Sequence, residues 1–200
     1  MKGSLIIVGF FVLGTICGVC HLLPFDIAET NISYYALCAL MFSVGLSVGN
    51  DPQTLKNFRS LNPRLVFLPI MTILGTLAGS AAVSLILTHR SITDCLAVGS
   101  GFGYYSLSSI FITEYKGAEL GTIALLANIS REILTLLAAP LLVRWLGNLA
   151  PISAGGATTM DTTLPIITRT AGQQFVVVSI FHGFVVDFSV PFLVTLFCSI

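Results

Sequence analysis

Residues Leu120–Leu146 read LGTIALLANISREILTLLAAPLLVRWL, an apolar run interrupted by Asn128, Arg131, Glu132 and Thr135. Offsets of 0, 3, 4 and 7 place these four side chains on one face of a helix. A charged side chain near the centre of a bilayer costs about 2.5–3.5 kcal/mol on insertion scales, so such residues usually face a polar cavity and serve a function. We therefore predict a membrane-spanning helix whose polar face carries the function.

The composition extends this prediction to the whole chain. Hydrophobic residues make up 55% of the sequence and charged residues 9%, whereas a soluble domain carries about 25% charged residues. The net charge is zero, and no basic run indicates nucleic-acid binding. The five cysteines lie in or beside apolar segments, so we interpret them as free thiols in the packing. We predict neither a metal site nor a cofactor.

Apolar runs of about 17–25 residues have the length that crosses a bilayer core. We predict an all-α polytopic membrane protein with six transmembrane helices, at Ser4–Leu22, Ser33–Gly49, Leu65–Thr88, Cys95–Thr113, Leu120–Leu146 and Gln174–Ile200. Leu149–Thr168 either crosses as a seventh helix or re-enters. We expect one membrane domain, with residues 1–90 as scaffold and residues 91–200 forming the transport site.

The distribution of basic residues predicts the orientation. With seven crossings, six basic residues lie on one side: Lys2, Lys56, Arg59, Arg64, Lys116 and Arg169. The opposite side then holds Arg90 and Arg144. Because cytoplasmic loops carry the excess of Lys and Arg, we predict a cytoplasmic N-terminus and an external C-terminus. If residues 149–168 re-enter instead of crossing, the C-terminus moves to the inside.

Glycines interrupt two of the predicted membrane segments. Residues 99–106 read GSGFGYYS, and residues 153–165 read SAGGATTMDTTLP. The expected backbone breaks lie at Gly99, Gly101, Gly103, Gly155 and Gly156. Unwound backbone at membrane depth is tolerated only where it is buried in protein or lines a cavity, and the exposed helix ends suit ionic ligands. We therefore predict that both breaks line a transport site, although the second could also be an ordinary external loop.

The last predicted helix adds a second acidic residue near mid-membrane, Asp187. His182 lies five residues earlier, about 140° around the helix, so the two side chains do not share a face. We interpret His182 as a residue that hydrogen-bonds to a neighbouring helix.

Four motifs together resemble a known family, the bacterial LysO-type lysine exporters. They are SGFGYYSLS at 100–108, NISRE at 128–132, GATTMDTTLP at 156–165 and HG at 182–183. The resemblance covers essentially the whole chain. It implies a multi-pass protein of the bacterial inner membrane that exports L-lysine and its analogue thialysine, and it implies an essential acidic residue at Glu132.

The chain departs from the family in one respect. Single-chain members carry a further N-terminal part with additional helices and another functional acidic residue. Since Met1-Lys2 looks like a natural start, we expect a separate small membrane subunit to supply those helices, with a homo-oligomer as the alternative.

Lysine presents two ammonium groups and one carboxylate. Glu132 and Asp161 can receive the ammonium groups, while Arg131 or the N-terminus of a broken helix can receive the carboxylate. The remaining candidate substrate-binding residues are Asn128, Tyr105, Ser106 and Thr159. Tyr104 is a further candidate to contact the aliphatic stem.

Export of a cation against the membrane potential costs about 2.3 kcal/mol per charge at about 100 mV, so an exporter needs a driving ion. Burial favours the protonated form of a carboxyl group. We therefore predict that Glu132, with Asp187 in reserve, exchanges an incoming proton for an outgoing lysine. A nearby Arg131 would oppose this by favouring ionised Glu132, and the sequence leaves that competition open.

Three other functions deserve comparison. A monovalent-cation/proton antiporter would use the same buried acids, and a non-transporting subunit of a membrane complex would need none of them. Gly45-Leu-Ser-Val-Gly49 matches the nucleophile pattern of serine hydrolases. That pattern belongs to a strand-turn-helix setting, so we reject a protease and predict that the protein is not an enzyme.

Overall fold

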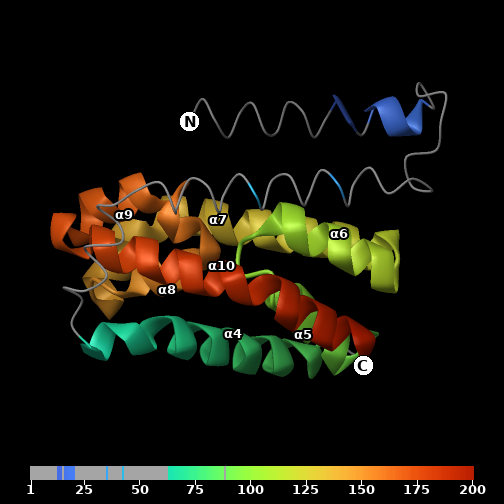
Figure 1. Cartoon of the computed structure of the whole chain (residues 1–200), viewed down its shortest axis with the longest axis horizontal. Coiled ribbons are helices and arrows are strands. Elements are labelled where there is room, and N and C mark those ends of the chain that lie inside the picture. The colour runs from blue at the N-terminus through green and yellow to red at the C-terminus, as the bar shows by residue number, and fades with distance from the viewer. Residues whose placement is uncertain (1–12, 15, 21–34, 36–41, 43–62, 88) are drawn as a thin grey trace. The chain divides into compact units, whose positions relative to one another are not determined.

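The structure is a computed structural model that describes residues 13–14, 16–20, 35, 42, 63–87 and 89–200 (Figure 1). The chain forms two compact units, residues 1–45 and 46–200. Every helix labelled in Figure 1 belongs to the second unit. Most of the predicted helices Ser4–Leu22 and Ser33–Gly49, together with the Gly45–Gly49 motif, lie outside the described residues.

Three helices are long and apolar enough to cross a membrane in the described part of the chain. They are α4 (Leu68–Ser84), which continues the 3-10 turn η2 (Pro63–Phe67), α7 (Ala118–Leu146) and α10 (Val176–Ser199). The described residues contain no strand. These findings confirm the all-α membrane class, and the three helices match three of the predicted spans.

The predicted span Cys95–Thr113 is wrong, because this segment turns back on itself. Helix α5 (Ile92–Gly99) and helix α6 (Tyr105–Lys116) are separated by non-helical residues 100–104. Asp94 in the first turn of α5 lies 3.9 Å from Lys116 in the last turn of α6. The beginning and the end of the segment therefore lie at the same end of the bundle (Figure 1). We call α5, α6 and their connection hairpin 1.

The segment that follows α7 also turns back. It consists of α8 (Ala150–Gly155), the 3-10 turn η3 (Gly156–Met160) and α9 (Leu164–Ala171), followed by the short turn η4 (Gln173–Phe175). Ile152 of α8 packs in one apolar cluster with Ile167 and Ala171 of α9. We call α8, η3 and α9 hairpin 2. It enters from the end of the bundle opposite to hairpin 1 (Figure 1).

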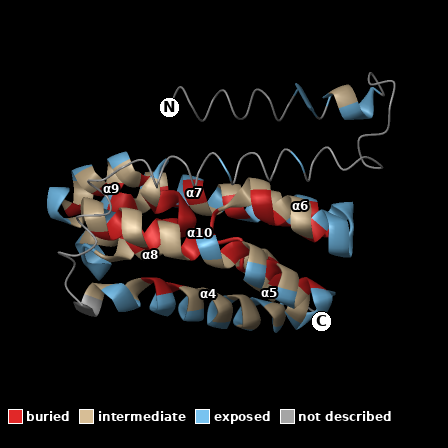
Figure 2. Cartoon of the chain, in the orientation of Figure 1, coloured by how far each residue is buried: buried red, intermediate tan, exposed pale blue. Residues whose placement is uncertain are grey.

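The tips of the two hairpins lie in the interior of this unit. Residues 100–103 and 155–159 are buried, and Figure 2 shows buried residues along α7 and α10 beside them. The breaks are shorter than the predicted ranges 99–106 and 153–165, because Gly99 and Gly155 are the last residues of α5 and α8. The fold thus places two sets of half-helix ends at its centre.

Candidate functional site

The two hairpin tips contact each other through backbone. The Ala157 N–H donates a hydrogen bond to the Phe102 carbonyl at 2.9 Å. Gly156 has φ +64°, and a Cβ there would lie 2.2 Å from the Phe102 oxygen. Gly103 has φ +94°, and a Cβ there would lie 3.1 Å from the Gly155 oxygen. Only glycine combines this backbone conformation with so close an approach, so the predicted glycine breaks do come together.

Asn128 of α7 holds hairpin 1. The Gly103 N–H donates to Asn128 Oδ1 at 2.8 Å. Asn128 Nδ2 donates to the carbonyls of Val98 and Ala124 at 3.2 and 2.9 Å. Asn128 is 3% exposed. A broken helix leaves backbone groups without partners. Asn128 bonds to such groups and therefore stabilises the fold of hairpin 1.

Arg131, also on α7, holds hairpin 2. Its Nε donates to the Ala154 carbonyl at 2.8 Å and its Nη2 to the Ser153 carbonyl at 3.0 Å. Both Nη atoms lie 3.4 Å from Thr76 Oγ1 on α4. The guanidinium group therefore sits at the C-terminal end of α8, where a positive charge is favoured. Among the described residues, no ion pair joins Arg131 to Glu132.

Glu132 lies among acidic and phenolic groups instead. It is 8% exposed and lies beside the Thr162 side chain. Thr162 also donates its N–H to Asp161 Oδ1, in the exposed turn before α9. Glu132 and Asp161 lie close enough for their charges to interact with each other and with Tyr105, the first residue of α6. The structure therefore brings residues of α7 and of both breaks into one region.

Asp187 of α10 is a third carboxylate in this region. It is 5% exposed, and its charge interacts with those of Tyr104 and Asp161. Asp187 makes no hydrogen bond or ion pair with any residue that the structure describes. We call Glu132, Asp161 and Asp187 the acidic cluster.

His182 and Thr159 belong to a buried hydrogen-bonded chain. His182 Nε2 lies 2.9 Å from Thr72 Oγ1 of α4, and its Nδ1 lies 3.3 Å from Thr159 Oγ1. Thr159 also donates to the Ser179 carbonyl of α10 at 2.9 Å. Both His182 and Thr159 are fully buried. The interpretation of His182 as a residue that bonds to a neighbouring helix is confirmed, and Thr159 bonds to protein groups.

Some residues of the site were missed or are less involved than predicted. Thr72 and Thr76 of α4 contact His182 and Arg131, although residues 1–90 are predicted to form only a scaffold. Two threonines four residues apart in an apolar helix were the available signal. Ser106 lies in the first turn of α6, and its carbonyl accepts a 3.4 Å hydrogen bond from Ser109.

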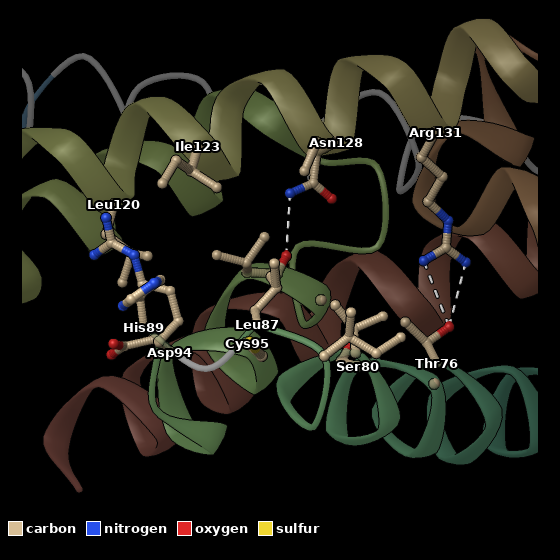
Figure 3. Close-up of a pocket in the computed structure, with 17 residues that line it drawn as sticks. Thr76, Ser80, Leu87, His89, Asp94, Cys95, Leu120, Ile123, Asn128 and Arg131 are labelled. Atoms are coloured by element: carbon tan, nitrogen blue, oxygen red, sulfur yellow. Dashed lines mark hydrogen bonds between the residues drawn. The ribbon is translucent and has the colours of Figure 1, made fainter.

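A cavity of about 830 Å³ lies between α4, α5 and α7. Figure 3 shows Asn128 and Arg131 at one end of it, and His89 and Asp94 at the other. Glu132 does not line this cavity. The cavity therefore reaches from the base of hairpin 1 to the residues of α7 that hold the hairpins.

Comparison with known proteins agrees with the resemblance read from the motifs. The sequence model of the lysine exporter LysO family matches residues 8–198. The chain is 36% identical over 196 residues to the lysine exporter LysO of Escherichia coli (strain K12). That match covers 98% of this chain and 64% of the E. coli protein, so the chain spans just under two thirds of this relative.

A second relative is closer in length. The chain is 34% identical over 196 residues to a Haemophilus influenzae (strain Rd) protein provisionally named a lysine exporter, covering 98% of this chain and 96% of that protein. No solved structure gives a significant match. With nearly the whole chain matched, the protein belongs to the lysine exporter LysO family.

Proposed function

We propose that this protein exports L-lysine across the membrane, with Glu132 and Asp161 as the groups that receive its ammonium charges. The observation that carries the proposal is a buried carboxylate on α7, Glu132, beside Asp161 at the tip of a broken hairpin. Carboxylates form strong charge-assisted hydrogen bonds with ammonium groups. The names of the relatives, lysine exporters, indicate lysine as the substrate. Thialysine also carries two ammonium groups and should follow the same path.

The α-carboxylate of the substrate needs a positive partner, and Arg131 is already bonded to hairpin 2. The N-terminus of α6 is the better candidate. Its N-cap has no side-chain hydrogen bond, and its first residues are Tyr105 and Ser106. Free N–H groups and the helix dipole favour an anion at such an end.

We further propose a cytoplasmic N-terminus in the bacterial inner membrane, and the distribution of basic residues supports this orientation. With both hairpins re-entrant, the start of η2 and the last turns of α7 and α9 carry Arg64, Arg144 and Arg169 at one end of the bundle. The base of hairpin 1 carries Arg90 and Lys116 at the other end. If residues 4–22 and 33–49 both cross, Lys2, Lys56 and Arg59 join the first group, which gives six against two. The positive-inside rule then makes the first end cytoplasmic and the C-terminus external.

Export of cationic lysine also needs an energy source and a complete site. We propose exchange for an incoming proton, because outward movement of a cation costs about 2.3 kcal/mol per charge at about 100 mV. A separate small membrane subunit, or a second copy of the chain, would complete the site. The chain matches 64% of the E. coli relative and 96% of the H. influenzae relative.

Lysine efflux tests the proposed function. Cells loaded with labelled lysine should release it faster when they express this chain, alone or with a small membrane protein encoded beside it. Glu132→Gln should abolish this release at equal protein level in the membrane, because a neutral amide cannot pair with an ammonium group.

A competition experiment separates lysine export from monovalent-cation transport. Unlabelled lysine should inhibit transport of labelled lysine in membrane vesicles, and excess sodium or potassium should not. Inhibition by sodium or potassium alone would favour a cation/proton antiporter. Unchanged efflux on expression, with or without the neighbouring protein, would favour a non-transporting subunit.

A further inference from the structure

Asp187 lies on α10, apart from Thr162, which borders the other two members of the acidic cluster. Glu132 lies beside the Thr162 side chain, and Asp161 accepts a hydrogen bond from the Thr162 N–H. Asp187 is 5% exposed and makes neither a hydrogen bond nor an ion pair with any described residue. Loss of surrounding water disfavours the ionised form of a carboxyl group that has no partner. The Asp187 oxygens remain accessible, because no fully buried side-chain oxygen of the described residues lacks a partner. A proton can therefore reach Asp187 and is favoured there.

The surroundings of Asp187 favour a proton. Tyr104, between α5 and α6, and Asp161, after η3, are the titratable groups whose charges interact with it. Neither brings a positive charge, and the acid Asp161 further disfavours a second negative charge nearby. A metal cation needs several oxygen ligands around it, whereas a proton needs one carboxylate oxygen.

The location of Asp187 connects its charge to both hairpins. Helix α10 packs against α5 and α6 of hairpin 1 and against η3 of hairpin 2. Tyr104 belongs to the tip of hairpin 1, and Asp161 to the tip of hairpin 2. A change in the charge of Asp187 would therefore act on a residue of each hairpin.

We propose that Asp187 takes up the proton that drives export, while Glu132 and Asp161 bind the substrate. This inference rests on the proposed function and divides it between two sites. The proton enters from outside, bonds to a carboxylate oxygen of Asp187 to give a neutral acid, and leaves to the cytoplasm after lysine has gone out. Exchange of one proton for one lysine monocation moves no net charge, so the membrane potential does not oppose it.

Everted membrane vesicles can separate the two sites, because their lumen corresponds to the outside of the cell. An acid lumen should drive labelled lysine into wild-type vesicles. Asp187→Asn should abolish this driven uptake but retain exchange of labelled lysine against lysine loaded in the lumen without a gradient. Glu132→Gln should abolish both processes. Asp187→Glu, which keeps a titratable carboxyl group, should retain driven uptake.

Asp94→Asn is the matched control, because Asp94 is a carboxylate at the base of hairpin 1, where it lies 3.9 Å from Lys116. It should retain both driven uptake and exchange. Driven uptake by Asp187→Asn equal to that of the wild type would overturn the inference and leave lysine export intact. Loss of exchange in this variant would also overturn it, by assigning Asp187 to the substrate site. Driven uptake by a sodium gradient, and not by an acid lumen, would replace the proton with sodium.

A second measurement does not depend on transport. The infrared spectrum of the purified protein should show the C=O stretching band of a protonated carboxylic acid, and Asp187→Asn should remove it. An unchanged band in a folded variant would contradict the inference. If wild-type vesicles fail to exchange lysine, the proposed function fails, and the infrared band still decides whether Asp187 holds a proton.

Discussion

Arg131 and Glu132 are neighbours in the sequence, yet their side chains serve different parts of the molecule. Arg131 bonds to the last carbonyls of α8 and reaches Thr76, whereas Glu132 lies beside Thr162 and Asp161. Adjacent helical residues point about 100° apart, so one helix can hold a hairpin with one side chain and present a carboxylate with the next. Because the two side chains point in different directions, the effect of Arg131 on the ionisation of Glu132 is weakened.

Arg131→Lys should destabilise the fold. A lysine ammonium lacks the planar fork that bonds the Ser153 and Ala154 carbonyls together. Buried carbonyls left without a donor cost about 1–3 kcal/mol. Thermal unfolding of the purified protein should show a lower midpoint for Arg131→Lys. The control is Arg144→Lys, an exposed position on the same helix, which should leave the midpoint unchanged. Equal midpoints for the two variants would contradict a stabilising role of the hydrogen bonds between Arg131 and α8.

At the scale of the elements, the two hairpins depend on glycine where they touch. The Phe102 carbonyl accepts a hydrogen bond from Ala157, and its oxygen would lie only 2.2 Å from a Cβ at Gly156. Phe102 itself has φ +46°, an unusual conformation for a residue with a side chain. The tips can approach only because a glycine faces this carbonyl.

Gly156→Ala should separate the tips and abolish lysine efflux. Gly147→Ala is its matched control, because Gly147 also has positive φ, +90°, but has no atom within 4 Å of an added Cβ. Both substitutions carry the strain of a left-handed conformation, about 1–2 kcal/mol. Only Gly156→Ala adds the clash with Phe102. Efflux that is equally reduced in both variants would indicate backbone strain and contradict a role for the tip contact.

At the scale of the whole molecule, the hairpins change how the chain is threaded through the membrane. The sequence predicted that Cys95–Thr113 crosses, which would put His89 and Tyr115 on opposite sides. In the structure the bases of α5 and α6 meet, with Arg90 paired to Glu119 and Asp94 beside Lys116. Both positions therefore belong to one side, and the end of α7 belongs to the other.

Labelling of single cysteines tests this arrangement. In a variant without the native cysteines, His89→Cys and Tyr115→Cys should react with an impermeant thiol reagent added outside intact cells. Trp145→Cys should react only after the membrane is opened. All three positions are exposed, so accessibility within the protein does not differ greatly. If His89→Cys and Tyr115→Cys were labelled from opposite sides, residues 95–113 would cross the membrane and the re-entrant arrangement would be wrong.

The sequence predicted the class of fold and the polar face of α7, because charges in an apolar helix are rare and carry a strong signal. It also located both breaks, since the density of glycine at 99–103 and 155–156 is visible directly. It could not predict the reversal of hairpin 1. A glycine weakens a helix whether the chain continues or turns, and the direction depends on contacts far along the chain. The role of Thr72 was hidden for the same reason, since its partner His182 is 110 residues away.

The opposite entry of the hairpins has a consequence for motion. Residues 92–146 and 150–199 each consist of a re-entrant hairpin followed by a long helix, and the second set runs through the bundle in the reverse direction. Two halves that contain the same order of elements but run in opposite directions can exchange conformations with each other. Such an exchange would convert a conformation open toward the cytoplasm into one open toward the exterior. Access could then alternate while the carboxylates between the halves stay in place.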